Sequence, residues 1–270
     1  MRAADDRSPA KPSQTALRVA ALRRSFTRLP HTSGDAAAED RLVAAILSDA
    51  APLAKSRTTE YGARFRAYLE RRTRFFDAFT VEAITAGIDQ IVIVAAGYDG
   101  RALRYATPGV TFFEIDHPDT QQHKRQLLHD LGVDAAGIEF VAVDLVSGSA
   151  DSSLALTAHS RARPSAFLVE GLAVYIPRDD LARLLVDLRR AAAAGSRLAV
   201  SFPGRSNADV GRAALAMYVA SLGEPMRVEI DVAEFRALLA DAGWEADAAG
   251  GESPNLISAV AVSSPNGPVD

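Results

Sequence analysis

Short runs of apolar residues alternate with longer amphipathic segments through the middle of the chain. The β-branched run at 91–94 is too short for a helix and predicts a strand buried on both faces. Runs at 110–115, 138–143, 164–169 and 197–202 predict four more strands. Leucines at helical spacing, clearest over 181–188, predict helices between them. Alternating strands and helices predict an α/β fold with a mostly parallel sheet and helices on both faces.

The segment before the first strand has a different pattern. Residues 1–13 are charged and contain Pro9 and Pro12, so we expect them to be disordered. Thr15 is a candidate cap for a helix over 16–28, and further helices are expected at 36–48 and 61–86. These helices predict an N-terminal helical cap over residues 14–86.

The C-terminal part closes the predicted sheet. Residues 244–248 and 256–262 flank Gly250-Gly251 and predict a β-hairpin, which places one strand antiparallel in the sheet. Such an ending is more typical of a class I methyltransferase, with its Rossmann-like seven-stranded sheet, than of a nicotinamide dehydrogenase. We expect this domain to cover 87–264, with 205–224 as a helical insertion over the site.

Composition narrows the class of protein. The chain has 270 residues, a formal net charge of −4 and no cysteine. The charge offers no electrostatic reason to expect nucleic acid or an anionic membrane, and no apolar run approaches a membrane span. The absence of cysteine excludes disulfides and thiolate chemistry. A cytoplasmic protein is expected, and a homodimer is left open.

A glycine turn follows the first predicted strand. Gly97 lies where that strand must turn, and Asp116 ends the next strand, about 20 residues further on, where it can accept hydrogen bonds from two ribose hydroxyls. Ala95 and Gly100 do not fit the spacing of a dinucleotide fingerprint. A ligand with one ribose and no pyrophosphate fits better, and S-adenosylmethionine is the leading candidate. A generic turn without a ligand, and a nicotinamide oxidoreductase, are the alternatives.

Acidic residues lie near four predicted strand ends. They are Asp99, Asp116, Asp144 and Glu170. Asp144 could accept from the adenine amino group, Leu145 could cover the ring, and Glu170 could face the ammonium or the reaction centre. Any one of these acids could instead be a helix cap or lie in a solvated loop, and that interpretation is favoured for Asp99.

An arginine lies on the apolar stripe of the helix at 61–86. Arg72 falls between Leu69 and Phe76, and a guanidinium on a core-facing side needs an anion. One interpretation is a salt bridge to Asp77, Glu70 or another acid. The other is a contact with a ligand carboxylate, such as the methionine tail of the cofactor.

These pieces together resemble the leucine carboxyl methyltransferase family. The resemblance is closest to its bacterial branch of S-adenosylmethionine-dependent methyltransferases, which includes enzymes that methylate carboxyl groups of polyketides. The matching pieces span nearly the whole chain: Thr15-Ala16, residues 72–77, 94–99 with Arg101, 113–118 with Lys124, 143–145, 169–172 with Tyr175, and 242–244. The resemblance implies cofactor contacts from Gly97, Asp116, Asp144, Leu145, Glu170, an arginine near Arg72, and, by a looser match, Arg23.

One departure from the family bears on activity. The family usually has Gly-Ala-Gly-x-Asp-Thr-Arg, whereas residues 95–101 read Ala-Ala-Gly-Tyr-Asp-Gly-Arg. Ala95 therefore adds a methyl group where the cofactor would pass. Two hypotheses follow: an O-methyltransferase acting on a small-molecule carboxylate, or a methyltransferase fold that has lost methyl transfer and serves as a non-methylating enzyme or interaction partner.

Methyl transfer to a carboxylate needs little side-chain chemistry. The nucleophile is already ionised at pH 7, so no general base is required, whereas a hydroxyl acceptor would favour one. Tyr175 and Glu170 are the candidate catalytic residues, and His117 is close in the motif. His117, His123 and His129 are six residues apart and do not share a helix face, so no metal site is expected.

Overall fold

The structure is a computed structural model that describes residues 14–30, 33–49, 60–202, 230–247 and 255–262. The expected N-terminal tail and the expected insertion at 205–224 lie outside these residues. The first three helices are α1 (Gln14–Arg23), α2 (Ala36–Asp49) and α3 (Glu60–Thr85). Five strands follow: β1 (Gln90–Val94), β2 (Thr111–Asp116), β3 (Ile138–Ala142), β4 (Ser165–Val169) and β5 (Arg197–Ser201).

Four helices lie between these strands, and one helix and two strands complete the described chain. The intervening helices are α4 (Arg101–Arg104), α5 (Pro118–Asp130), α6 (Ala150–Leu154) and α7 (Arg178–Ala191). The last elements are α9 (Val232–Asp241), β6 (Trp244–Ala246) and β7 (Leu256–Ala261). α9 starts with the capping box formed by Asp231 and Glu234. No helix of the described ranges is long and apolar enough to cross a membrane.

The seven strands form one sheet in the order β3-β2-β1-β4-β5-β7-β6. β1 to β5 pair in parallel, and β7 pairs antiparallel with both β5 and β6. The mostly parallel sheet and the antiparallel C-terminal hairpin are therefore confirmed. β1 lies between β2 and β4, so the chain leaves β1 where the strand order reverses, which is where open α/β sheets bind ligands.

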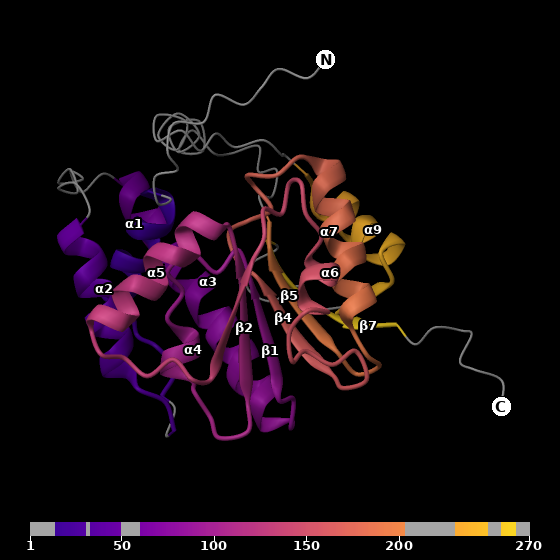
Figure 1. The fold of residues 1–270 in the computed structure, drawn as a ribbon. Coiled ribbons are helices and arrows are strands. Elements are labelled where there is room, and N and C mark those ends of the chain that lie inside the picture. The colour runs from indigo at the N-terminus through magenta and orange to yellow at the C-terminus, as the bar shows by residue number, and fades with distance from the viewer. Residues whose placement is uncertain (1–13, 31–32, 50–59, 203–229, 248–254, 263–270) are drawn as a thin grey trace, which may run out of the picture.

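Helices cover both faces of the sheet (Figure 1). Side chains along β1 point alternately to the two faces of the sheet, which gives two hydrophobic cores. Val92 and Val94 pack in the core with α6, α7 and α9. Ile91 and Ile93 pack in the core with α1 to α5. The N-terminal helices therefore pack on the same side as α4 and α5. This packing brings the cap beside the carboxyl ends of the central strands.

Two expected boundaries differ from the structure. The first helix ends at Arg23 rather than near 28, with Thr15 inside the helix instead of at its cap. Residues 24–30 instead form a turn and an extended segment that carries Arg28 toward α3. The sequence predicts that the helix after β2 begins near Thr120. It begins at Pro118, because proline suits the first turn of a helix and His117 occupies the cap.

Candidate functional site

The carboxyl ends of β1, β2 and β4 lie side by side at one edge of the sheet. Val94 is in register with Ile115 of β2 and Val169 of β4. The residues that follow these positions are therefore neighbours. The topology brings the glycine turn, Asp116 and Glu170 to one place, as the sequence predicted.

The turn after β1 is bound to the end of β2. The carboxylate of Asp116 accepts hydrogen bonds from the backbone N–H of Gly97 and, at 2.6 Å, of His117. Burial raises the pKa of Asp116, although these donors oppose the rise. Ala95 and Gly97 adopt φ values of 53° and 51°, in the left-handed region. A carboxylate offers about four acceptor positions, so Asp116 can still receive ribose hydroxyls.

A buried lysine supports this turn from α5. Lys124 Nζ donates to the carbonyl oxygen of Asp99 at 2.6 Å and to Glu114 Oε2 at 2.6 Å. Burial raises the pKa of Glu114, and Lys124 opposes that rise. Glu114 Oε1 is buried and has no hydrogen-bond partner among the described residues. Lys124 thus ties the turn to both β2 and α5, a role that the sequence motif alone did not indicate.

Asp144 organises the loop after β3. Its oxygens accept from the backbone N–H of Val146 and the hydroxyl of Ser147, both at 2.9 Å. Arg183 of α7 donates to the carbonyl oxygens of Leu145 at 3.1 Å and of Val146 at 2.9 Å. The half-buried Leu145 packs against the core cluster on that side of the sheet. The loop is therefore held in place, and the adenine contacts of Asp144 and Leu145 stay predictions.

Three arginines hold Glu170 at the end of β4. Its Oε1 is 2.7 Å from Arg23 Nη2 and 2.9 Å from Arg72 Nε, and its Oε2 is 2.7 Å from Arg101 Nη1. Burial disfavours the charged carboxylate, but Arg23, Arg101 and Arg72 outweigh it and hold the pKa of Glu170 well below its usual range. Glu170 is therefore a fixed negative charge at neutral pH.

Arg101 links Glu170 to two more acids. Its side chain is fully buried, with Nη1 2.5 Å from Asp99 Oδ2 and Nε 2.8 Å from Asp77 Oδ1. Its Nη2 donates to the carbonyl oxygen of Thr73 at 3.1 Å. Burial works against the guanidinium, yet Asp99, Glu170 and Asp77 raise the pKa of Arg101 further above its ordinary value. Arg101 therefore stays charged in the interior.

The ion pairs continue into the N-terminal cap. Arg28 Nε is 2.6 Å from Asp77 Oδ2, and Arg28 Nη1 is 2.7 Å from Glu39 Oε1. Glu39 Oε2 pairs with Arg104 of α4. We call the whole set the arginine–carboxylate cluster: Arg23, Arg28, Arg72, Arg101, Arg104, Glu39, Asp77, Asp99 and Glu170. It joins α1, α2, α3 and α4 to the end of β4.

The structure shows the surroundings of two side chains for which the sequence left alternatives open, Arg72 and Asp99. Arg72 pairs with Glu170 rather than with Asp77 or Glu70, so the partner is another acid. Asp99 does accept from the backbone N–H of Arg101 in the first turn of α4, at 2.8 Å. Of the two placements considered for Asp99, a helix cap or a solvated loop, the solvated loop is wrong, because Asp99 is buried between guanidinium groups of the cluster. Whether Arg72 also contacts a ligand carboxylate stays a prediction.

The remaining candidates are Tyr175 and the histidines. Tyr175 is half-buried in the loop between β4 and α7, where its backbone N–H donates to Leu172 at 2.8 Å. His123 Nδ1 lies 2.5 Å from the hydroxyl of Tyr98, whereas His129 is exposed. Within the described part of the chain, no group of three His, Cys, Asp or Glu side chains is placed to hold a metal ion.

Comparison with known proteins gives a family and a fold. The family model described as leucine carboxyl methyltransferase matches residues 16–189. A provisionally named S-adenosyl-L-methionine-dependent methyltransferase of Parafrankia sp. (strain EAN1pec) is 38% identical over 207 residues, which cover 72% of this chain and 64% of that protein. A similar relative in Mycobacterium marinum is 39% identical and is covered over 60% of its length. The chain thus spans less than two thirds of these relatives.

Solved structures share the fold at low sequence identity. A provisionally assigned methyltransferase of Thermobifida fusca YX has a TM-score of 0.58 at 15% identity, covering 94% of this chain and 96% of that one. Human N-acetylserotonin methyltransferase, solved in complex with S-adenosylmethionine, has a TM-score of 0.51 at 12% identity. The match covers 93% of this chain and 67% of that one. The likeness confirms the Rossmann-like methyltransferase architecture.

Proposed function

The chain belongs to the leucine carboxyl methyltransferase family, and we propose that it is an S-adenosylmethionine-dependent O-methyltransferase acting on a carboxylate of a small-molecule natural product. The observation that carries the proposal is the pairing of Asp116 with the backbone of Gly97 at the reversal of strand order. This pairing presents an acid and a left-handed glycine turn together at the sheet edge. The combination suits a nucleoside with one ribose.

The residues present fit the chemistry of this cofactor. Asp116 keeps acceptor capacity for ribose hydroxyls. Glu170 is an ionised carboxylate, and its three arginines leave about one acceptor position for an ammonium. The side chains of Arg72 and Arg23 are beside Glu170 and supply cations for a carboxylate. A Cβ on Gly97 would lie 3.1 Å from the Cβ of Ala16, so α1 covers the turn closely and a larger side chain would crowd it.

Catalysis would then rest on position and on exclusion of water. The bound cofactor supplies an activated methyl group on a sulfonium. A carboxylate acceptor is ionised at neutral pH, so the chain needs no general base and must align the acceptor oxygen with that group. The low pKa of Glu170 makes it a poor base, so we assign it to holding charge. Tyr175 is proposed to orient the acceptor.

The class of acceptor rests on the family resemblance, which favours polyketide-like acids. If the methyl acceptor were a hydroxyl group, the reaction would require a general base. A cytoplasmic location stays a prediction. The first test is isothermal titration with S-adenosylmethionine and S-adenosylhomocysteine. We expect one site, weakened by on the order of 1–3 kcal/mol in Asp116→Asn, because buried polar partners are left unmade. Unchanged affinity in that variant would remove Asp116 from the site.

A second candidate function is favoured by Ala95. It has a left-handed φ of 53° at the family's first glycine position. A protein that holds the cofactor or its product without transferring methyl groups would account for this substitution. Cofactor binding without turnover on a panel of aromatic and polyketide acids, with turnover appearing in Ala95→Gly, would favour this alternative.

A further inference from the structure

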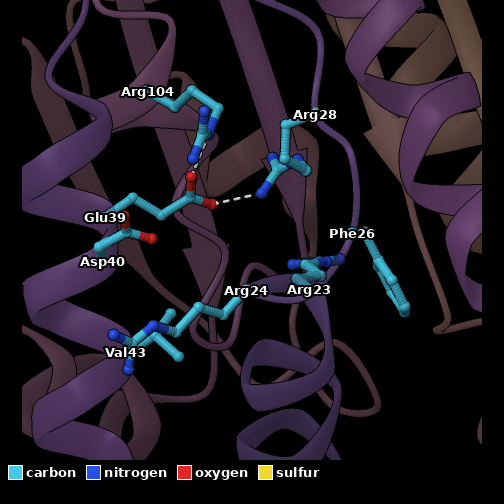
Figure 2. A pocket seen from close by; sticks show the side chains of 8 residues that line it. All are labelled: Arg23, Arg24, Phe26, Arg28, Glu39, Asp40, Val43 and Arg104. Carbon is cyan, nitrogen blue, oxygen red and sulfur yellow. Dashed lines mark hydrogen bonds and ion pairs between the residues drawn. The ribbon is translucent and has the colours of Figure 1, made fainter.

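A cavity of about 190 Å³ lies between α1, α2 and α4, next to the arginine–carboxylate cluster. In Figure 2, Arg28, Glu39 and Arg104 lie together, and the side chain of Arg24 extends from the opposite side toward Val43. Arg23 and Asp40 also line it. Arg24 and Asp40 are exposed, so the cavity reaches the surface.

Four arginines and two acids line this cavity, and Arg23 and Arg28 also pair with acids outside the lining. Both oxygens of Glu39 are taken, one by Arg28 and one by Arg104. Arg104 uses only its Nε in that pair, and Arg24 makes no ion pair with a described residue. Among the described residues, Asp40 is the one lining acid without an ion pair, and it is solvent-exposed.

The cluster behind the cavity also has an excess of positive charge. Among the described residues, its five arginines face four carboxylates, an excess of one cation. Burying an uncompensated charge is costly, so the interior favours an added anion. The Nε of Arg23 is also buried without a hydrogen-bond partner in the described part of the chain. Its two Nη atoms are already committed to Asp99 and Glu170.

We propose that this cavity binds a small oxyanion, either a phosphate or a carboxylate, at a site separate from the cofactor site. Guanidinium groups bind such anions through pairs of N–H donors, and Arg24 and Arg104 have donors to spare. Arg23 lies between this cavity and Glu170, so it forms a wall shared by the two sites. The site goes beyond methyl transfer and does not depend on the proposed reaction.

The test is a calorimetric titration of the full chain with inorganic phosphate, in chloride buffers of constant ionic strength. We expect saturable binding at one site, with affinity reduced about tenfold in Arg24→Gln, because a charged hydrogen-bonding partner is lost. Arg24 is exposed and forms no described ion pair, so this variant should fold normally. The matched control is Arg190→Gln on α7, which should bind phosphate as the wild type does. Arg104→Gln, checked for folding by circular dichroism, should also weaken binding.

Two further arms distinguish the sources of the signal. Acetate tested in the same way separates a carboxylate site from a phosphate site, and either response supports the proposal if Arg24→Gln reduces it. Equal binding in the wild type and Arg24→Gln, or no saturable binding of either anion, would overturn it and leave water in the cavity. Loss of phosphate binding at saturating S-adenosylmethionine would also overturn it, by assigning the anion to the cofactor's carboxylate position. A chain that fails to bind the cofactor would still give a readable phosphate titration.

Discussion

The glycine turn at the ends of β1 and β2 and the arginine–carboxylate cluster at the end of β4 share one edge of the sheet, yet they are held differently. The turn depends on backbone contacts within residues 95–124. Asp116 accepts a hydrogen bond from a main-chain N–H, and Lys124 donates one to a main-chain carbonyl. The cluster depends on side chains of α1, α2, α3 and α4, on Arg28 after α1 and on Glu170 after β4. Arg23 and Glu170 are 147 residues apart in the sequence (170 minus 23).

This difference affects charge as well as construction. At the turn, burial prevails and the pKa values of Glu114 and Asp116 are raised. In the cluster, the arginines prevail and the pKa values of Asp77, Asp99 and Glu170 are lowered. Acids of similar burial therefore respond in opposite directions, because the number of cations within reach decides which effect is larger.

The largest expected effect is at the centre of the cluster. Among the described residues, Arg101 is the cation shared by Asp77, Asp99 and Glu170. Arg101→Met should lower the free energy of unfolding by about 3–5 kcal/mol, because three buried carboxylates each lose one of their guanidinium partners. Urea denaturation measures the loss. Arg190→Met on the surface of α7 is the control and should change stability by less than about 0.5 kcal/mol. A loss below about 1 kcal/mol in Arg101→Met would mean that the cluster is not a structural unit.

The second effect is at the support of the glycine turn. Lys124→Met should cost about 2–4 kcal/mol, because Glu114 is left buried without a cation and the carbonyl of Asp99 loses a donor. Adding Glu114→Gln should recover part of the loss, since the unpaired charge is then gone. If the loss in the free energy of unfolding of the double variant equals the sum of the two single losses, the two side chains do not act as a pair.

The opposite pKa directions give a third prediction, on pH. The folded pKa of Glu170 is depressed, so its stabilisation is complete above its ordinary value near 4.5 and is lost as pH falls below that value. Glu114 has a raised folded pKa, so acidification through the range just above 4.5 relieves a cost. Urea unfolding between pH 3 and pH 7 should therefore show a shallower acid loss in Glu170→Gln and a steeper one in Glu114→Gln. The differences should reach about 1 kcal/mol, and identical slopes would contradict the assignment.

The smallest effect is at Ala95. Ala95→Gly removes the cost of a left-handed alanine, about 1–2 kcal/mol, although the unfolded chain gains freedom that offsets part of it. We expect a net stabilisation of about 0.5–1 kcal/mol by thermal unfolding, with cofactor affinity equal or tighter. Ala96→Gly is the neighbouring control: Ala96 is buried without a left-handed φ, so the same substitution should destabilise the fold.

Much of the fold and of the turn could be predicted from the sequence. The apolar runs identified β1 to β5 within about one or two residues, and the glycines near 250 indicated the antiparallel hairpin. Gly97 and Asp116 were identified together because a strand, a turn and a second strand lie within one short segment. Local sequence is sufficient there, since the contacts are between near neighbours and use the backbone.

The cluster was decided by the tertiary structure. The sequence indicated that Arg72 needs an anion, but Glu170 is 98 residues away and could not be chosen over nearer acids. Likewise, no local pattern connects Arg28 with Asp77, or Glu39 with Arg104. Side chains pair according to distance in space, and only the packing of the N-terminal helices against the sheet brings these charges together. The sequence alone therefore determined where the strands end and turn, and the packed cap decided which charges meet there.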